Sequence, residues 1–556
     1  MGFPPRRSVT LFTVLVAASP IGPTPVAAQP ANARVDSLFS FATPTTPGCA
    51  VAAIKDGQLL FARGYGLADI EHQVAISRQT PFYMASTSKQ FAAGAINLLA
   101  LDGKLSLDDD VRKFVPELPQ FGAPITVRHL LTHTSGLRDY FGLFGMAGYP
   151  SDYPITNGAF LEMMRRQRTL NFPTGTQYSY SNSGYVLLSI IVERASGQSL
   201  RDFSAERFFT PLGMRSTQFR DQHNQLVPNR ALAYGRNARG EYVHAVPYFD
   251  VVGDGGLYST VEDIARWEAN FLEPKVGGVE WLRLEQMRGR LNDGTTIAYG
   301  AGLMHGKFRG DSIIEHGGSL GGYNINLLRF PARRMSVAVL CNDNTRSASQ
   351  LSRGVAEIFL GDVLAPVSAT AATPTASSPP ATTSTDGNTL AKFTGTWFSP
   401  STNLVRRVVA DQGRLYFERA LGSRSELASV GVSRFVIMTM NTTAIFSRRA
   451  DSLRLEQDGA PAQLFVRVTP PTKALSAYAG SYRSAELRAT MTVTPRDSII
   501  MLRTESGDSL RLTGVFVDGF SGALFVRFLR GAGGTVTAME VSAGDRARNV
   551  RFERMR

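Results

Sequence analysis

Apolar runs typical of strands occur near residue 50 and again between residues 311 and 343, with helical spacing between them. The run AVAAIKDGQLLFARGYG contains two strand segments joined by Asp56-Gly57, which favours a tight hairpin turn. The segments DSIIEHGG, YNINLLRF and MSVAVLCND also predict strands, and ASQLSRGVAEIFLG predicts a closing helix. From about Ser86, apolar residues recur three and four positions apart, which predicts a helix. This order predicts an α+β domain built on one antiparallel sheet flanked by helices.

The C-terminal part of the chain repeats itself at an offset of 85 residues. LAKFTGTWFS at 390–399 and LSAYAGSYRS at 475–484 both contain an aromatic residue, a glycine and a second aromatic residue in the same order. Each is followed by short alternating segments bounded by Gly, Asp and Ser, such as RLYFERA and DSIIMLRT. Many short strands of this kind predict two small antiparallel β-barrel-like modules, at 390–470 and 471–556.

Two segments of biased composition flank the predicted N-terminal domain. Residues 364–389 form an Ala/Thr/Pro/Ser tract without periodicity, which predicts a linker. Residues 1–28 contain two arginines, an apolar run and then Val26-Ala27-Ala28, as in a signal peptide with its cleavage site. We therefore expect a mature domain over 29–363 in a protein exported to the periplasm or the extracellular space. No other stretch approaches the ~20 apolar residues of a membrane span.

The formal net charge of +13 is unevenly distributed along the 556 residues. Residues 392–556 hold 24 basic and 14 acidic side chains, so the predicted N-terminal domain is close to neutral. The basic residues are not clustered with aromatic residues or in a known module, so we expect no nucleic-acid partner. The two cysteines, Cys49 and Cys341, lie in apolar runs, where a disulfide and a pair of buried free thiols are both consistent with export.

Ser319 is one candidate nucleophile, because it lies in a Gly-x-Ser-x-Gly pattern found in many esterases. That pattern requires a strand, a sharp turn and then a helix whose N-terminus lies beneath the serine. The sequence after Gly321 instead predicts a strand, a turn and another strand. We therefore do not expect Ser319 to be the nucleophile.

Ser86 is a better candidate, because it lies three residues before Lys89 at the start of the predicted helix. This spacing places both side chains on one face, one turn apart. A lysine kept away from water can accept the proton of a neighbouring serine, or its charge can lower the pKa of another acceptor. Tyr180 would be such an acceptor if a nearby ammonium group lowers its pKa from about 10.

Three short motifs occur in order along the N-terminal domain. They are Ser86-x-x-Lys89, Tyr180-x-Asn182 and His316-Gly317-Gly318. Together they resemble the serine β-lactamase and penicillin-binding-protein superfamily, more narrowly its class C β-lactamase, DD-peptidase and D-aminopeptidase branch. Structural segments of that branch are also similar to HLLTHTSGL at 129–137, PLGM at 211–214, GGLYST at 255–260 and YGAGL at 299–303. The resemblance implies a β-lactamase-like domain with an all-helical subdomain, and catalysis without a cofactor.

The resemblance also implies roles for residues on the helical side of the site. Ser86 would be the acylated nucleophile, and Lys89 its electrostatic and proton-handling partner. Tyr180 would be the general base and then the acid that protonates the leaving group. Asn182 would bind the amide of the substrate.

The strand that carries His316, Gly317 and Gly318 would form the opposite wall of the site. The backbone N–H groups of Ser86 and Ser319 would form the oxyanion hole, where loss of one donor typically costs about 10²–10³ in rate. Many β-lactamases of this superfamily have lysine at the position of His316. A histidine, whose charge depends on pH near neutrality, instead resembles the DD-peptidase and D-aminopeptidase side.

Two other polar clusters match metal-binding patterns only in part. His129 and His133 are four residues apart but lack the glutamate of a His-Glu-x-x-His pattern, so we expect no metal there. The aspartates at 108–110 lack the alternating spacing and the glycine of a calcium loop, and we expect a solvated helix cap instead.

The sequence therefore predicts an exported serine hydrolase that cleaves an amide, such as one in a D-amino-acid peptide, or an ester. The substrate would be a small molecule or a short peptide, such as one derived from the cell wall. A carboxylesterase, a β-lactamase and a non-turnover penicillin-binding sensor are the alternatives, and nothing in the sequence indicates an oligomeric state. The C-terminal modules resemble the lipocalin-like modules of D-aminopeptidases, in which a barrel loop can reach the mouth of the active site.

Overall fold

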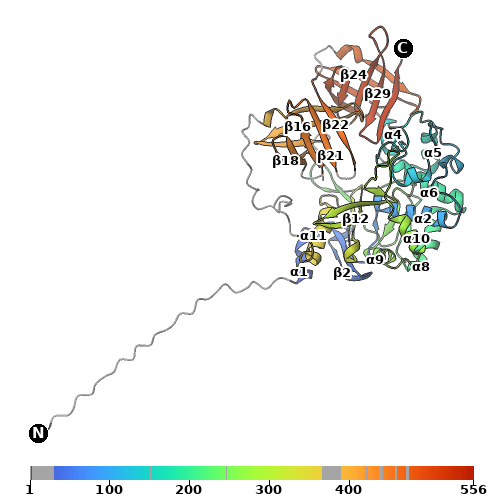
Figure 1. The fold of residues 1–556 in the computed structure, drawn as a ribbon, viewed down its shortest axis with the longest axis vertical. Coiled ribbons are helices and arrows are strands. Elements are labelled where there is room, and N and C mark those ends of the chain that lie inside the picture. The colour runs from blue at the N-terminus through green and yellow to red at the C-terminus, as the bar shows by residue number, and fades with distance from the viewer. Residues whose placement is uncertain are drawn as a thin grey trace.

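A computed structural model describes residues 2, 30–150, 152–245, 247–365, 390–419, 424–437, 442–457, 460–470 and 475–556. Apart from residue 2, the predicted signal peptide lies outside these residues, and so does the predicted linker apart from residues 364 and 365. Figure 1 shows an N-terminal domain of mixed helices and strands, with two barrels, coloured orange and red, packed along one side of it.

A seven-stranded antiparallel sheet forms the centre of the N-terminal domain and confirms the predicted α+β class. In spatial order its strands are β10 (Tyr299–Gly300), β11 (Leu303–Phe308), β12 (Asp311–Leu320), β13 (Tyr323–Phe330), β14 (Met335–Cys341), β1 (Cys49–Lys55) and β2 (Gln58–Tyr65). The predicted hairpin between β1 and β2 turns at Asp56 and Gly57, which both have positive φ angles, of 52° and 77°. Because β14 pairs with β1 along its whole length, strands from the two ends of the domain lie side by side in the sheet, next to its β2 edge.

Strand β1 is apolar almost throughout because both of its faces are buried. Alternate residues from Cys49 pack into a core formed with α1 (Ala31–Leu38) and α11 (Ala348–Leu360). The intervening residues, beginning with Ala50, join the main core on the other face. There α9 (Val261–Asn270) contacts β1, β2 and β14, and the remaining helices complete the domain.

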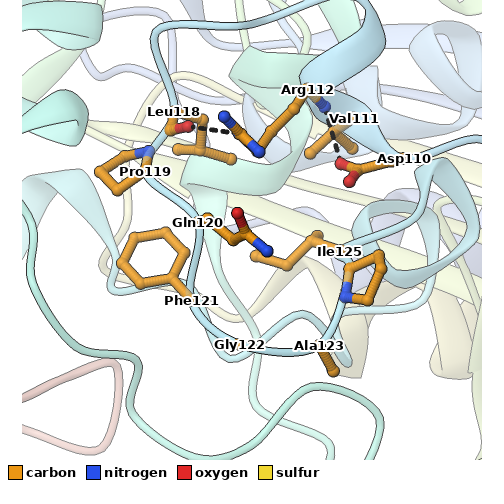
Figure 2. A pocket seen from close by; sticks show the side chains of 11 residues that line it. Asp110, Val111, Arg112, Leu118, Pro119, Gln120, Phe121, Gly122, Ala123 and Ile125 are labelled. Atoms are coloured by element: carbon orange, nitrogen blue, oxygen red, sulfur yellow. Dashed lines mark hydrogen bonds between the residues drawn. The ribbon is translucent and has the colours of Figure 1, made fainter.

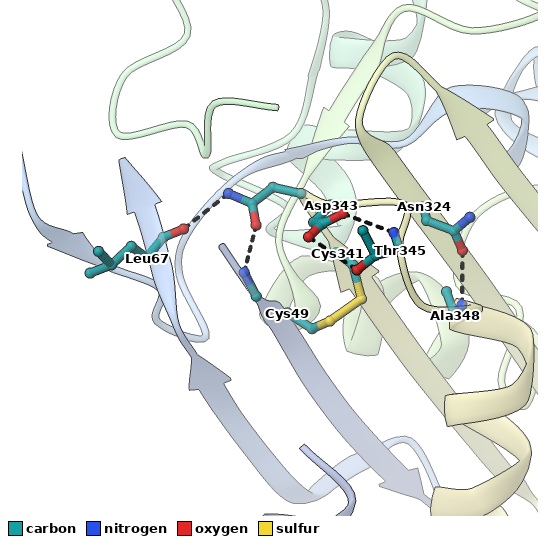
Figure 3. The surroundings of a disulfide bond; sticks show 9 residues. Cys49, Leu67, Asn324, Cys341, Asp343, Thr345 and Ala348 are labelled. Atoms are coloured by element: carbon teal, nitrogen blue, oxygen red, sulfur yellow. Dashed lines mark hydrogen bonds between the residues drawn. A yellow bond between two sulfur atoms is a disulfide. The ribbon is translucent and has the colours of Figure 1, made fainter. Parts of the chain in front are cut away.

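The two cysteines form a disulfide between directly opposed positions of β1 and β14 (Figure 3). Close to it, Asn324 on β13 accepts a hydrogen bond of 2.8 Å from the backbone N–H of Ala348, at the start of α11. Of the two alternatives left open by the sequence, the structure has the disulfide. It links strands whose cysteines are separated by 292 positions in the chain.

Removing this bond should destabilise the N-terminal domain. Loss of a native disulfide typically lowers the free energy of unfolding by about 2–5 kcal/mol, largely because the unfolded chain gains freedom. We expect Cys49→Ala/Cys341→Ala, or wild type with a reductant, to unfold several degrees lower in a thermal melt. Adding reductant should not shift the melting temperature of the double variant further. A wild-type melt that is insensitive to full reduction would contradict the expectation.

An all-helical region covers the face of the sheet opposite α1 and α11. Its helices are α2 (Lys89–Leu101), α3 (Val127–Leu131), α4 (Tyr140–Met146), α5 (Asn157–Arg165), α6 (Asn182–Ser196), α7 (Leu200–Ser204), α8 (Thr210–Leu212) and α10 (Gly278–Glu285). The central helix α2 is buried from Lys89 to Leu99, and Phe91 stacks on Trp267 with ring centroids 4.1 Å apart. Among the described residues, no helix has both the length and the apolar character needed to cross a membrane.

Short elements connect the helices and the sheet. Three small sheets pair β5 (Phe82–Tyr83) and β6 (Gln218–Phe219) with β9 (Leu257–Ser259), β3 (Leu67–Asp69) with β4 (Val74–Ala75), and β7 (Tyr234–Arg236) with β8 (Tyr242–His244). The short helical turns are η1 (Ala85–Ser88), η2 (Val111–Lys113), η3 (Ala205–Phe209), η4 (Pro331–Arg333) and η5 (Leu475–Tyr478). As predicted for the aspartate run, Asp110 caps a helical turn, η2, by accepting from the backbone N–H of Arg112 at 2.9 Å.

The C-terminal part forms two closed antiparallel barrels of eight strands each, as the short alternating segments predict. The first contains β15 (Gly395–Ser399), β16 (Leu404–Asp411), β17 (Arg414–Glu418), β18 (Arg424–Gly431), β19 (Arg434–Ile437), β20 (Thr442–Phe446), β21 (Ser452–Gln457) and β22 (Ala460–Val468). The second contains β23 (Gly480–Ser484), β24 (Ala489–Arg496), β25 (Ile499–Arg503), β26 (Ser509–Phe516), β27 (Gly519–Ser521), β28 (Phe525–Arg530), β29 (Val536–Ala543) and β30 (Ala547–Arg554).

The repeat at an offset of 85 residues has a structural basis in both barrels. Gly395 and Gly480 begin the first strand of each barrel with nearly the same φ, 143° and 142°. In each case a Cβ atom on the glycine would lie 3.0–3.2 Å from the Nε of an arginine, Arg467 or Arg554, on the strand that closes the barrel. Both the φ angle, which residues with a side chain rarely adopt, and the adjacent guanidinium group therefore favour glycine at these two positions.

Candidate active site

Ser86 lies in the turn η1, immediately before the buried helix α2. The preceding residue, Ala85, has a φ of 46°, a left-handed conformation that a residue with a Cβ rarely adopts. Such strain persists only where surrounding contacts fix it, and it is common at functional sites. Ser86 itself is partly exposed and lines a cleft of about 810 Å³.

Lys89 is fully buried and makes three polar contacts with its Nζ atom. These are to Ser86 Oγ at 3.2 Å, Asn182 Oδ1 at 2.9 Å and the backbone carbonyl of Asp254 at 2.7 Å. Burial lowers the pKa of Lys89 to about 7, although the charges of Asp254 and Asp139 act in the opposite direction. A buried amine with a pKa near neutrality is suited to accept and return a proton.

Asn182 is held in one orientation by Asp139, the residue that caps α4. Asp139 Oδ2 accepts from the backbone N–H of Asn182 at 2.8 Å and from its side-chain Nδ2 at 2.9 Å. Because a carboxylate only accepts, the amide nitrogen must face Asp139 and the amide oxygen must face Lys89. Asp139 and Asp254 were not among the predicted site residues. Asp139 comes two residues after HLLTHTSGL, and Asp254 directly precedes GGLYST. Their positions beside these family-like segments were the only feature of the sequence that could have indicated them as site residues.

Tyr180 lies beside Lys89, whose Nζ is 4.9 Å from the centre of its ring. Burial raises the pKa of Tyr180, and only partial opposition comes from the Ser86 hydroxyl and the charge of Arg546. The lowered pKa that would make Tyr180 a proton acceptor is therefore not found. The phenol oxygen is buried near the Ser86 hydroxyl and has no other hydrogen-bond partner among the described residues.

The ring of Tyr180 is fixed by His133, with ring centroids 4.2 Å apart. His133 Nδ1 also accepts from the backbone N–H of Ser181 at 3.2 Å, so it anchors the loop that carries Tyr180. His129 has a separate structural role, because its Nδ1 accepts from the backbone N–H of Thr126 in a capping box.

Strand β12 forms the other wall of the cleft. A Cβ atom at Gly318 would lie 2.5 Å from the carbonyl of Met84 and 3.0 Å from the backbone N of Ser86, so only glycine allows this approach. Side chains alternate along a strand, so Gly318 faces η1 and the exposed Ser319 side chain faces the other way. The segment continues as a β-hairpin with β13 and contains no helix after Ser319, in agreement with the sequence argument against an esterase elbow.

The same strand presents an open edge to the cleft. Strand β11 pairs with β12 only as far as Glu315, and residues 316–320 continue beyond it as part of the cleft lining. Backbone groups on this edge are available to an extended ligand, as at other exposed sheet edges. The sequence-predicted oxyanion donors, the backbone N–H groups of Ser86 and Ser319, thus belong to segments that are in direct contact.

His316 is buried and uncharged. Its Nδ1 lies 2.7 Å from the carbonyl of Gly317, and its Nε2 lies 3.0 Å from the hydroxyl of Tyr299. A carbonyl only accepts, so Nδ1 carries the hydrogen and Nε2 accepts from Tyr299. Burial, together with the charge of Lys89, lowers the pKa of His316 to about 3. The prediction that the charge of His316 changes near neutral pH is therefore wrong, because its ring is buried beside Lys89.

All the predicted site residues meet in this one cleft, although they are up to 233 positions apart in the chain. Lys89, behind the lining, reaches it through Ser86 and Asn182. The second barrel adds Ala543 and Arg546 to the lining, which no motif indicated. A separate hollow beneath the loop at 110–125 (Figure 2) has a volume of only about 20 Å³, too small for a substrate.

A family model described as Beta-lactamase matches residues 40–360, more than half of the chain. The chain belongs to the beta-lactamase family. This confirms the resemblance carried by the three motifs and identifies the protein as a serine hydrolase of the beta-lactamase family.

Two curated relatives of this beta-lactamase-family protein are similar over most of their length. A D-aminopeptidase of Cereibacter sphaeroides is 28% identical over 456 residues, which are 81% of this chain and 82% of the relative. A penicillin-binding protein of Bacillus subtilis is 29% identical over 435 residues, 74% of this chain and 93% of the relative. Among solved structures, the octameric penicillin-binding protein homologue from Pyrococcus abyssi has a TM-score of 0.55 at 24% identity, covering 78% of this chain and 99% of that one, which shows the shared fold.

Proposed function

We propose that this protein hydrolyses an amide bond next to a D-amino acid through an acyl-enzyme on Ser86. The main support for this proposal is the contact between Lys89 and Ser86, which places a buried amine next to a serine hydroxyl at the edge of a cleft. The volume of about 810 Å³ suits a short peptide or a small amide. The similarity to a D-aminopeptidase over 82% of that relative supports an amide of a D-amino acid as the substrate.

Lys89 is the better candidate for the base that activates Ser86. A neutral amine has two hydrogens and one lone pair, and the carbonyl oxygens of Asn182 and Asp254 both require a hydrogen. The lone pair is then left for the third neighbour, Ser86 Oγ, at 3.2 Å. In acylation Ser86 Oγ bonds to the substrate carbonyl carbon while its proton passes to Lys89 Nζ. The oxyanion that forms is stabilised by the backbone N–H groups of Ser86 and Ser319.

Tyr180 is assigned the proton transfer to the leaving group. With a raised pKa, its phenol is protonated and can donate to the leaving nitrogen as the carbon–nitrogen bond breaks. The ammonium of Lys89, which lies beside Tyr180, then gives its proton to the phenolate oxygen, so that both groups return to their starting states. Deacylation follows the same steps in reverse, with water in place of the leaving amine.

The acylation rate should rise with pH and reach half its maximum near pH 7. Only the neutral amine of Lys89 accepts a proton, and its pKa of about 7 means that the neutral fraction grows as pH increases. His316, with a pKa of about 3, stays neutral over this range, whereas Asp254, whose pKa burial raises to about 6, titrates at its acidic end. Acylation by an uncharged activated ester, followed between pH 5.5 and 9, checks this. A flat or falling profile would exclude Lys89 as the base.

Substrate stereochemistry tests the proposed function. D-amino-acid amides and peptides should be hydrolysed by wild type at least tenfold faster than their L-enantiomers, and Ser86→Ala provides the blank. Amine release measured for matched enantiomers gives the ratio directly. Equal rates on both enantiomers, or a penicillin adduct that never turns over, would contradict the proposal and favour an esterase or a sensor.

A further inference from the structure

A hairpin of the second barrel is built into the cleft. Strands β29 and β30 are joined at residues 544–546, beside α4 (Figure 1). The backbone carbonyl of Arg546 accepts from the N–H of Asp139 at 2.8 Å and from Asn171 Nδ2 at 2.7 Å. A Cβ atom on Gly142 would lie 2.7 Å from the Cβ of Ala547, so the hairpin packs directly on the helix. These backbone contacts fix the hairpin independently of the Arg546 side chain.

A buried ion pair strengthens this attachment. Arg138 Nη1 lies 2.5 Å from Glu486 Oε2, and both side chains are at most 7% exposed. Arg138 also donates to the backbone carbonyls of Arg548 and Asn549, at 2.9 and 3.0 Å. The second barrel is therefore a fixed wall of the site.

The Arg546 guanidinium faces the catalytic groups without a carboxylate partner. Its centre lies 4.7 Å from the ring centroid of Tyr180, and the side chain is exposed. Within the part of the chain that the structure describes, Arg546 forms no ion pair and its guanidinium donates no hydrogen bond. Its five N–H donors are thus available to a ligand in the cleft.

The two acidic residues of the cleft lining form no ion pair with Arg546, although burial raises the pKa of Asp139 and the charge of Arg546 partly opposes this rise. Asp139 accepts from Asn182 and from the backbone N–H of Phe141, and Asp254 Oδ2 accepts from the hydroxyl of Tyr140 at 2.9 Å. Both carboxyl groups are buried. Near Tyr180, the cleft lining therefore presents a guanidinium group with unoccupied N–H donors, while its two carboxyl groups are buried and hydrogen-bonded to other residues.

We propose that Arg546 binds a carboxylate of the substrate on the leaving-group side of the scissile bond. This rests on the proposed function, in which Tyr180 protonates the leaving nitrogen, so a group that reaches Arg546 belongs to the leaving amine. A guanidinium group matches a carboxylate through two parallel hydrogen bonds. The preferred substrate is then a peptide whose departing residue has a free carboxyl terminus. A substrate with a free ammonium group at this position meets a like charge.

Three N-acetylated D-dipeptide substrates test the assignment. One has a free carboxyl terminus, the second is its carboxyl-terminal amide, and the third is its carboxyl-terminal 2-aminoethylamide, which places an ammonium group on the leaving residue. Wild type should prefer the free carboxylate to the amide by about tenfold in kcat/KM. Arg546→Ala should bring this ratio to near one, and Arg546→Lys should retain part of it because it keeps a charge without the planar fork. Arg546→Glu should favour the peptide with the ammonium group on its leaving residue. Arg511→Ala, which removes an exposed arginine of the same barrel outside the cleft lining, should keep the wild-type ratio.

Two results would overturn the inference while the proposed function stands. One is a wild type that hydrolyses the peptides without preferring the free carboxylate. The other is a preference that persists in both Arg546→Ala and Arg546→Glu. If instead none of the peptides is cleaved and an activated ester leaves Ser86 unlabelled, the proposed function fails and the inference fails with it. Because each result is a ratio within one variant, a partial loss of folded protein does not alter it.

Discussion

Ser86→Ala is expected to abolish acylation and to lower kcat/KM by about 10⁴–10⁶-fold. The variant removes the oxygen atom that forms the covalent bond to the substrate. That oxygen is partly exposed, so its loss leaves the cleft, the other contacts of Lys89 and the strained turn at Ala85 in place. Binding and backbone stabilisation of the oxyanion remain, which is why a small residual rate over uncatalysed hydrolysis should persist.

Intact-mass measurement over time with a labelled penicillin or an activated ester checks this directly. Wild type should gain one acyl group, and digestion should place it on Ser86. Ser319→Ala should still form the adduct, because its side chain faces away from η1 and the variant keeps the backbone N–H. Labelling that survives Ser86→Ala and disappears in Ser319→Ala would overturn the assignment of the nucleophile.

Local geometry explains which parts of the molecule the sequence predicted. The Ser86–Lys89 contact follows from a spacing of three residues at the start of a helix, which needs no tertiary information. The strands of the sheet and the two barrels follow from apolar alternation, and the hairpin at Asp56-Gly57 from its turn chemistry. Tyr180, Asn182 and His316 could be assigned to the site only through the resemblance to a known family.

Features that depend on tertiary packing could not be predicted from these patterns. The disulfide requires Cys49 and Cys341 to occupy opposed positions, which is set by the pairing of β1 with β14. The neutrality of His316 results from its enclosure beside Lys89, which no neighbour in the sequence shows. Arg546 lies 366 positions after Tyr180 and reaches it only because the second barrel docks on α4.

Lys89→Met should lower the acylation rate by about 10²–10⁴-fold, the range for loss of a general base. Methionine approximates the length and apolar volume of lysine, so the buried position stays filled while the amine is lost. Methionine carries no charge, so the variant avoids the desolvation cost of a buried ammonium group, and we expect it to fold. The rate of acyl-enzyme formation from an activated ester, measured before steady state, isolates the step in which Ser86 loses its proton. The rise of this rate with pH near 7 should disappear in the variant.

Tyr180→Phe is the matched control, because it removes one oxygen from the other candidate base. An activated ester has a leaving group that departs without a proton, so Tyr180→Phe should acylate at a rate close to that of wild type with this substrate. With an amide substrate the leaving nitrogen must be protonated, and the same variant should lose about 10²–10⁴-fold. Lys89→Met should be slow with both substrates. If Tyr180→Phe instead slows acylation by the activated ester as much as Lys89→Met does, Tyr180 is the base in spite of its raised pKa, and the roles proposed for the two residues are reversed.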